Sequence, residues 1–171
     1  MDTKPILLTC TALFLAALCV TAGGKPQRDD VEFTVIEEGS SPGYPSDPMI
    51  RVIDGGPGYQ SFYRRVHSGR VPPPEAPAVD LEENLVIFVS SGEKRTSGHS
   101  IQVRELFTRD DLLVAQALLI APPEGGFQAQ VITHPYVLLA VNRSVLEERG
   151  IRRVELRNDR GEVLARGRTA G

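Results

Sequence analysis

Cysteine is scarce in this sequence. Its 171 residues contain only Cys10 and Cys19, and both fall within an apolar stretch over residues 6–20. This stretch is shorter than a comfortable membrane-spanning helix, and the small residues that follow it, up to Ala22, are typical of a cleaved export signal. Removal of residues 1–22 would leave no cysteine for a disulfide, a thiol nucleophile or a thiolate metal site.

The sequence has no second apolar run of comparable length, so we expect an exported protein without a membrane span. A lipid-modified cysteine is the alternative to plain cleavage. Such a cysteine normally follows a small residue, and neither Leu18 before Cys19 nor Thr9 before Cys10 fits that pattern well. We therefore expect a periplasmic or extracellular protein whose mature form begins with a polar tether, residues 23–30.

Excess basic charge is also lacking, since the formal net charge is -3. Nucleic-acid binding needs a concentrated basic face, so this composition argues against it. The arginine-rich tail, residues 152–168, interleaves acidic residues with its arginines. That pattern is typical of a solvated hairpin rather than of an anion-binding patch.

Catalytic motifs are missing as well. The sequence has no G-x-S-x-G motif, no phosphate-binding loop and no Rossmann glycine pattern. Ser97, His99 and Ser100 lie too close in sequence to form the usual relay of nucleophile, base and orienting acid. The paired carboxylates Asp110-Asp111 and Glu147-Glu148 fall in an expected turn and an expected surface helix, where solvated side chains are common. We therefore expect a protein that is not an enzyme.

Histidine is too rare to predict a metal site. The chain has three histidines and no H-E-x-x-H spacing. His99 and His134 could meet if their loops were neighbours, but structural zinc needs four ligands. We expect neither a metal nor another cofactor.

Most of the mature chain has the pattern of β-strands. We expect strands over residues 31–39, 49–54, 85–90, 101–107, 112–120, 127–133 and 136–141, with a hairpin over 154–166. In the first strand Val31, Phe33 and Val35 would share one face, and Phe127, Ala129 and Val131 would do so in the sixth. The continuous apolar run Leu85–Ser90 predicts a strand buried on both sides, with Ile101–Phe107 as its hairpin partner.

Two short segments have helical patterns instead. Apolar side chains recur with a helical spacing in Tyr59, Phe62, Tyr63 and Val66, which predicts a two-turn helix lying on a sheet. Residues 144–147 form a capping box that opens a second short helix. Proline-rich segments over 40–48 and 71–80 can only be loop or extended linker.

Together these patterns predict a single mostly β domain over residues 31–166. We expect an antiparallel β-sandwich or a barrel-like sheet with one or two short helices. Residues 31–78 would supply the first strands, the helix and the linker, and residues 79–166 the β core.

The segment Gly92–Ser100, GEKRTSGHS, is longer than a simple strand reversal needs. Gly98 would provide a positive φ or a close backbone approach. Thr96 would bond either the backbone of its own loop or a partner. Lys94 and Arg95 would form either a solvated tip or a cationic contact for an acidic partner.

Residues 79–103, VDLEENLVIFVSSGEKRTSGHSIQV, resemble the signature of the PrcB family of protease complex subunits. That signature runs from a VDF strand through a G-x-R-P-T-G-G-Y-S-I loop to a further strand. Residues 131–141, VITHPYVLLAV, are similar to the T-x-P-Y strand of the same domain. This sequence differs in having Arg95 in place of proline, Ser97 in place of glycine and His99 in place of tyrosine.

The resemblance implies a non-catalytic accessory subunit that stabilises or modulates an exported protease. In a β-sandwich, loops that are not adjacent in sequence can share one end. The loops 92–99, 121–126 and 133–136 are similar in content to the inhibitory loops of chagasin-like cysteine-protease inhibitors, which suggests protease contact. The residues expected to contact the partner are Arg95, Thr96, Gly98, His99, Gly125, His134 and Tyr136.

Some readings of the sequence stay open. Tyr136 would serve as a core aromatic residue if it does not contact a partner, and Pro135 could follow a cis or a trans peptide bond. A structural envelope module without a protease partner is the alternative function, and a hydrolase is the next. The sequence does not determine the oligomeric state or the identity of the protease.

Overall fold

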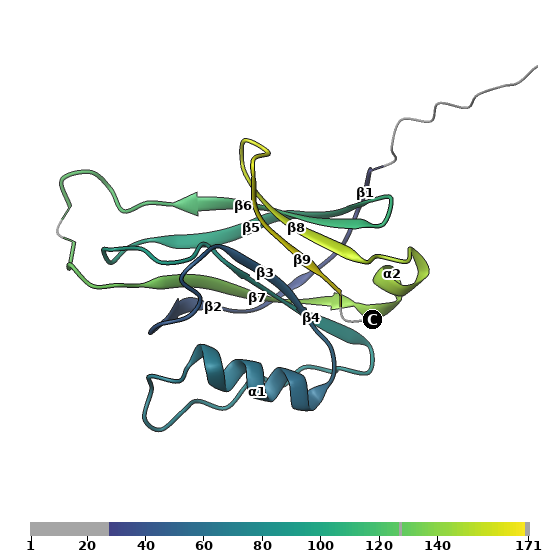
Figure 1. The fold of residues 1–171 in the computed structure, drawn as a ribbon, viewed down its shortest axis with the longest axis horizontal. Helices are drawn as coiled ribbons and strands as arrows, with labels where there is room; N and C mark the ends of the chain where they lie inside the picture. The colour runs from purple at the N-terminus through teal and green to yellow at the C-terminus, as the bar shows by residue number, and fades with distance from the viewer. Residues whose placement is uncertain (1–27, 127, 170–171) are drawn as a thin grey trace, which may run out of the picture.

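The computed structural model describes residues 28–126 and 128–169, which form two β-sheets packed face to face with two short helices (Figure 1). The larger sheet has the strand order β1-β5-β6-β8-β9, with β1 at Arg28–Asp30, β5 at Ser100–Arg109, β6 at Leu112–Ile120, β8 at Arg153–Asn158 and β9 at Val163–Arg168. The smaller sheet has the order β2-β7-β4-β3, with β2 at Thr34–Ser41, β7 at His134–Asn142, β4 at Asn84–Ser90 and β3 at Met49–Ile53. The helices are α1, Gly56–Val66, and α2, Arg143–Glu148. The prediction of a β-sandwich is confirmed, and the sheets do not close into a barrel.

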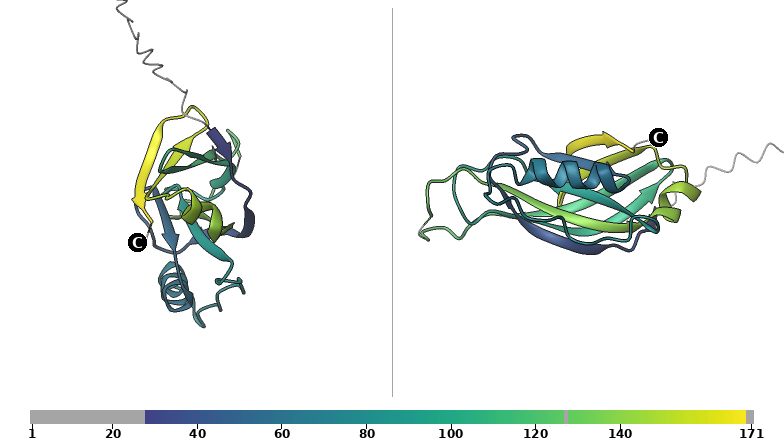
Figure 2. Two further views of the ribbon diagram at one scale, coloured as in Figure 1. Left: turned by 90° about the vertical axis from the view of Figure 1, so that its right-hand side faces the viewer. Right: turned by 90° about the horizontal axis from the view of Figure 1, so that it is seen from below.

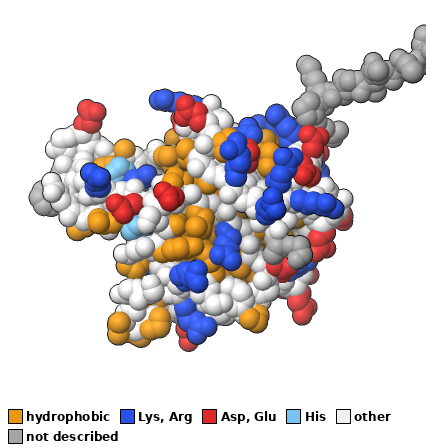
Figure 3. All heavy atoms as spheres, in the orientation of Figure 1, with side chains coloured by type: hydrophobic (Ala, Val, Ile, Leu, Met, Phe, Trp, Pro, Cys, Tyr) orange, Lys and Arg blue, Asp and Glu red, His pale blue; other side chains and the backbone are white. Residues whose placement is uncertain are grey.

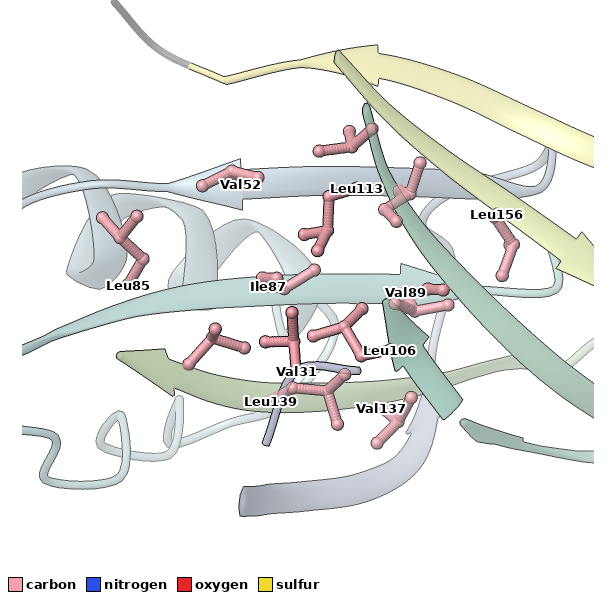
Figure 4. Close-up of a cluster of buried hydrophobic side chains, with 14 of the residues drawn as sticks. Val31, Val52, Leu85, Ile87, Val89, Leu106, Leu113, Val137, Leu139 and Leu156 are labelled. Carbon is pink, nitrogen blue, oxygen red and sulfur yellow. The ribbon is translucent and has the colours of Figure 1, made fainter. Parts of the chain in front are cut away.

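Strand β4 is buried on both sides, as its apolar run predicts. Successive side chains of a strand point to opposite faces. Ile87 and Val89 therefore enter the core between the sheets, whereas Val86 and Phe88 face the opposite way, toward α1. Figure 4 shows the inter-sheet cluster, in which Leu106, Leu113 and Leu156 of the larger sheet meet the side chains of β4 and β7.

Helix α1 covers the outer face of the smaller sheet (Figure 2). All four of its predicted apolar residues, Tyr59, Phe62, Tyr63 and Val66, are buried. The ring of Phe62 packs edge-on against that of Phe88, with centroids 4.9 Å apart. The predicted helix and its apolar face are therefore confirmed.

The strand pairing differs from the prediction in two places. Strand β5 pairs with β1 and β6 rather than with β4, because the segment between β4 and β5 crosses from one sheet to the other. Strands β6 and β8 are parallel, since the chain passes through β7 and α2 before it returns to the larger sheet. The sandwich is therefore not wholly antiparallel.

Local corrections fall mainly at the edges of the sheets. Residues 28–30, expected to lie in the tether, form β1. Val35 lies opposite Leu139, on the face that it was expected to share with Val31 and Phe33, but on the edge strand β2 it is 45 % exposed. In α2 the side chain of Asn142 accepts a hydrogen bond from the Ser144 backbone N–H, so Asn142 is the capping residue. The predicted signal, residues 1–22, lies outside the described residues.

A polar network lies between α1 and the smaller sheet. The carboxylate of Glu37, on β2, accepts hydrogen bonds from the hydroxyls of Tyr63, at 2.8 Å, and of Tyr136. Because Tyr136 donates its proton to Glu37, it accepts from Nε2–H of His67, 3.2 Å away. Among the described residues, neither Nδ1 of His67 nor the hydroxyl of Tyr59 has a hydrogen-bond partner. Glu37 therefore links β2, β7 and α1 in one network.

Burial sets the protonation of this network. It lowers the pKa of His67 below its ordinary value of 6.5, against the opposing attraction of the Glu37 carboxylate, and Arg70 adds to the lowering. Burial also raises the pKa of Tyr59 to about 12. Desolvation and the hydrogen bonds to Glu37 raise the pKa of Tyr63 and that of Tyr136 further. At neutral pH the imidazole and the three phenols are therefore uncharged.

We expect Tyr63→Phe to lower the free energy of unfolding by about 1.5–3 kcal/mol, because the change removes a hydrogen bond to a carboxylate. Tyr59→Phe is the matched control on the same helix. It removes a buried hydroxyl without a partner among the described residues and should leave stability unchanged or raise it. Urea denaturation of both variants would measure this difference. Equal losses in the two variants would show that the Glu37 contact contributes nothing specific.

The lowered pKa of His67 makes stability pH-dependent. Because the unfolded chain binds a proton at this histidine more readily than the folded chain does, the free energy of unfolding should fall as the pH drops below 6.5. The loss should level off once the pH is below the folded pKa. His67→Gln keeps an N–H donor without titrating, so its denaturation curves should show a smaller loss over the same range. A loss as large as that of the wild type would assign the effect to other groups.

Candidate functional site

The ladder between β4 and β7 continues beyond the ends of both strands. The last residue of β4, Ser90, lies opposite Tyr136, and farther out Lys94 pairs with Thr133. The backbone N–H of Lys94 donates to the carbonyl of Thr133 at 2.7 Å, and the return bond measures 2.9 Å. We define the loop tip as residues 92–99, 121–126 and 128–133. In Figure 1 it projects at the left of the molecule.

Between these two pairs the β4 side has residues 91–93, whereas the β7 side has only residues 134 and 135. Gly92 accommodates the extra residue. Gly92 has a φ of 73°, a conformation that side-chain-bearing residues rarely adopt. A Cβ at this position would lie 2.7 Å from the carbonyl oxygen of Ser46, and that same carbonyl accepts a 2.7 Å hydrogen bond from the Glu93 backbone. The root of the tip is therefore held against the loop between β2 and β3.

Further hydrogen bonds join the two arms of the tip. The backbone N–H of Ser97 donates to the carbonyl of Ala129 at 3.0 Å, and the hydroxyl of Ser97 accepts from the N–H of Ala129 at 3.0 Å. The Thr133 hydroxyl donates to the carbonyl of Thr96 at 3.1 Å. Residues 128–132 were expected to continue a strand, but they are an irregular arm held by these bonds.

The third loop reaches the tip at Gly98. This residue has a φ of 86°, and a Cβ built on it would lie only 2.9 Å from Cβ of Pro122. The prediction for Gly98 is confirmed, since the position needs both a positive φ and a close approach. Gly125 also has a positive φ, 75°, but nothing lies within 4 Å of its Cβ position. Residues 92–99, 121–126 and Thr133 thus gather at one end of the sandwich.

Two of the expected contact residues lie on the outer part of the tip. Arg95 is exposed, and no hydrogen bond or ion pair holds its side chain among the described residues. His99 is partly buried, and its Nε2 lies 3.1 Å from the hydroxyl of Thr96. The Thr96 hydroxyl therefore contacts a side chain of its own loop, whereas the sequence had left open a bond to the loop backbone or to a partner. Lys94 is also held within the loop, since its ammonium donates to the Ser91 carbonyl at 3.0 Å.

His134 and Tyr136 are corrections to the predicted contact surface. Both belong to β7 rather than to a loop, and only 3 % and 1 % of their surfaces are exposed. The Nδ1 atom of His134 lies 3.3 Å from the carbonyl of Ser41, and Tyr136 faces Glu37. These side chains position the root of the tip but are too buried for a partner to contact them. The peptide bond before Pro135 is trans.

The tip also carries exposed apolar side chains that the sequence pattern does not indicate. Val131 is 48 % exposed and Ile132 60 %. Alternation had placed Val131 on one face of a strand with Phe127 and Ala129, and no local pattern separates an irregular hydrogen-bonded arm from a strand. Figure 3 shows uncovered hydrophobic side chains at this end of the molecule beside charged ones of both signs. The tip therefore combines an uncommitted guanidinium with exposed aliphatic side chains.

Within residues 28–126 and 128–169, no group of three or more His, Cys, Asp or Glu side chains could hold a metal ion. His134 instead faces Glu93, with Nε2 4.0 Å from the carboxylate. None of the helices in the described ranges is long and apolar enough to cross a membrane.

Comparison with known proteins gives one match. Residues 85–142 match the family model described as PrcB C-terminal. No curated protein and no solved structure matches the chain. The matched segment runs from β4 to β7 and contains all three arms of the loop tip, so it spans both sheets. Residues 85–142 are thus similar to the C-terminal domain of PrcB, which supports the resemblance to this family seen in the sequence.

Proposed function

We propose that the chain is exported and acts as a non-catalytic accessory subunit that stabilises or modulates a protease through its loop tip. The observation that carries this proposal is the cross-bonded tip, which presents Arg95, Val131 and Ile132 beyond the ends of the strands. The family match supports a protease complex as the setting. The partner surface would need an apolar recess beside an acidic group.

The rigidity of the tip favours binding. A loop that must be ordered on association loses part of its binding energy, and a loop held in advance avoids that cost. Hydrogen bonds at Lys94, Ser97 and Thr133 hold the arms of this tip in advance. Arginine is enriched among residues that dominate binding energy, and apolar neighbours exclude water around it. Arg95, Val131 and Ile132, all exposed on the same tip, fit that arrangement.

The contact between Gly98 and Pro122 gives a test of how the tip is built. Gly98→Ala and Gly125→Ala both place a side chain at a positive φ, but only the first adds a clash, with Pro122. We expect Gly98→Ala to be the more destabilising of the two by about 1–3 kcal/mol, because the loops must separate to relieve overpacking. Thermal denaturation of both variants would measure the difference. Equal destabilisation would mean that the two loops do not rely on this contact.

Crosslinking and pull-down from the native envelope would test the proposed partner. The wild-type protein should recover a protease, and Arg95→Ala should weaken that complex by about 1–3 kcal/mol if the arginine is central to the interface. Val131→Ser with Ile132→Ser should also weaken it, at an unchanged melting temperature. Val71→Ser is the matched control, because Val71 is 96 % exposed and lies outside the tip.

The outcomes separate this proposal from its rivals. Failure of the wild-type protein to recover any protease would favour a structural envelope module. Recovery that all the tip variants leave unchanged would keep the protease partner but remove the tip as its binding site. Covalent labelling of the purified protein by a fluorophosphonate probe would instead indicate a hydrolase.

A further inference from the structure

The two outer faces of the sandwich are not equivalent. Helix α1 covers the smaller sheet, whereas neither described helix lies across the larger one (Figures 1 and 2). Leu113 and Ala115 of β6 point into the core, so Leu112 and Val114 point to the outer face of the larger sheet. Figure 3 shows many Lys and Arg side chains, with Asp and Glu side chains between them, over the part of the molecule where β1, β8 and β9 lie.

The strand register aligns arginines in a row across this outer face. Arg28 on β1 lies opposite Arg109 on β5, and Arg109 lies opposite Leu112 on β6. Leu112 in turn lies opposite Arg153 on β8, and Arg153 lies opposite Arg168 on β9. Residues directly opposite one another share a face. The row therefore crosses all five strands with an arginine on every strand except β6.

The next row toward the middle of the sheet is partly apolar. It contains Phe107, Val114 and Glu155, in register across β5, β6 and β8. Phe107 and Val114 are buried although neither of the described helices covers them. The guanidinium of Arg28 lies 4.1 Å from the centre of the Phe107 ring. Arginine side chains thus cover apolar surface with their stems while their charged ends face the solvent.

Ion pairs fix four of the arginines on this face. Arg28 pairs with Glu105 at 2.6 Å, and Arg153 pairs with Asp111. Glu155 accepts from Arg157 at 2.6 Å and from Arg166 at 3.0 Å. By contrast, Arg109 and Arg168 are exposed and have no hydrogen bond or ion pair within the described part of the chain. Two guanidinium groups in the row are therefore uncommitted.

This arrangement does not favour folding. Like charges directly opposite one another in a sheet are destabilising, and the row contains two such pairs, Arg28 with Arg109 and Arg153 with Arg168. The chain as a whole has a net charge of -3, so the row does not follow from a basic composition. Arg153 and Arg168 also line a surface hollow of about 340 Å³ whose floor includes Leu112. Acidic side chains already pair with Arg28 and Arg153, and an anionic partner would neutralise the other member of each pair, Arg109 and Arg168.

We propose that this arginine face binds the surface of a bilayer that contains anionic phospholipids. At the usual strand spacing of about 4.8 Å, the row spans about 19 Å, so it presents its guanidiniums to several headgroups at once. The chain that remains after the expected removal of residues 1–22 still enters the domain at Arg28, in this row.

The row and the loop tip lie at opposite ends of the larger sheet. Strand β5 leaves the tip at Ser100 and reaches the row at Arg109. A bilayer that contacts the row would therefore leave the tip free for a protein partner. The arginine row and the loop tip are separate surfaces, so lipid binding at the row does not depend on the proposed protein binding at the tip.

Sedimentation with lipid vesicles tests the proposal. A chain that begins at Gly23 keeps every described contact, because the described structure begins at Arg28. It should sediment with vesicles that contain phosphatidylglycerol and not with pure phosphatidylcholine. Each arginine near an anionic surface contributes about 1 kcal/mol, so Arg109→Gln with Arg168→Gln should weaken binding about 30-fold. The same double variant breaks no described ion pair and should melt at the same or a slightly higher temperature.

Arg64→Gln with Arg65→Gln is the matched control. It removes the same charge from exposed positions on α1, on the other side of the sandwich, and should leave vesicle binding unchanged. Equal weakening by the control would show a net-charge effect and overturn the proposal, as would undiminished binding of the Arg109 and Arg168 variant. Retention of the wild type on heparin without binding to anionic vesicles would also overturn it, in favour of a soluble polyanion.

Discussion

The antiparallel pairing of β4 with β7 is the interaction on which the rest of the structure depends. Both strands are buried on both sides, so one pair of strands contributes to the inter-sheet core and to the layer beneath α1. Their register also determines where the chain leaves and re-enters the smaller sheet. Because Ser90 lies opposite Tyr136, the segments beyond them begin side by side, and the bond pair between Lys94 and Thr133 extends the same ladder outward. The loop tip is therefore a continuation of the core strands.

The polar network around Glu37 fixes the position of α1 on the smaller sheet. Apolar burial of Phe62 and Val66 would hold α1 against the sheet without fixing its position closely. The hydroxyls of Tyr63 and Tyr136 both donate to the Glu37 carboxylate, and these bonds favour one position of α1 on the sheet. A shifted helix would leave the carboxylate with fewer donors. Glu37 stands on β2, an edge strand, next to a bulge. A bulge and a charge at a strand edge also hinder pairing with another chain.

The sequence predicts the local features of this fold and much less of its long-range pairing. The uninterrupted apolar run of β4 and the helical spacing of Tyr59 and Phe62 are set by neighbouring residues, and both predictions are confirmed. Gly98 is another such case, because positive φ is a property of one residue. Strand pairing is different. The crossing from β4 to β5 and the parallel contact of β6 with β8 depend on which distant strands bury each other best.

The candidate site also has local features that the sequence predicts and long-range features that it does not. The loops and the central role of Gly98 could be found from composition, whereas the burial of His134 and Tyr136 depends on β7 extending to His134 between two neighbouring strands. The exposure of Val131 and Ile132 arises because the arm pairs only at scattered positions. Alternation along a sequence measures amphipathic character but does not show whether a second sheet is present to cover the apolar side.

The arginines of β8 and β9 show how register changes the meaning of a sequence pattern. Along the chain the tail interleaves acidic residues with its arginines, which indicates a solvated hairpin. Folding adds Arg28 and Arg109 from strands more than forty residues away and aligns them with Arg153 and Arg168. The acids of the tail do not follow into that row, because Glu155 lies one row farther along and is occupied by Arg157 and Arg166. Charges that alternate along the sequence are therefore partly separated across the sheet, where Arg109 and Arg168 have no acidic partner among the described residues.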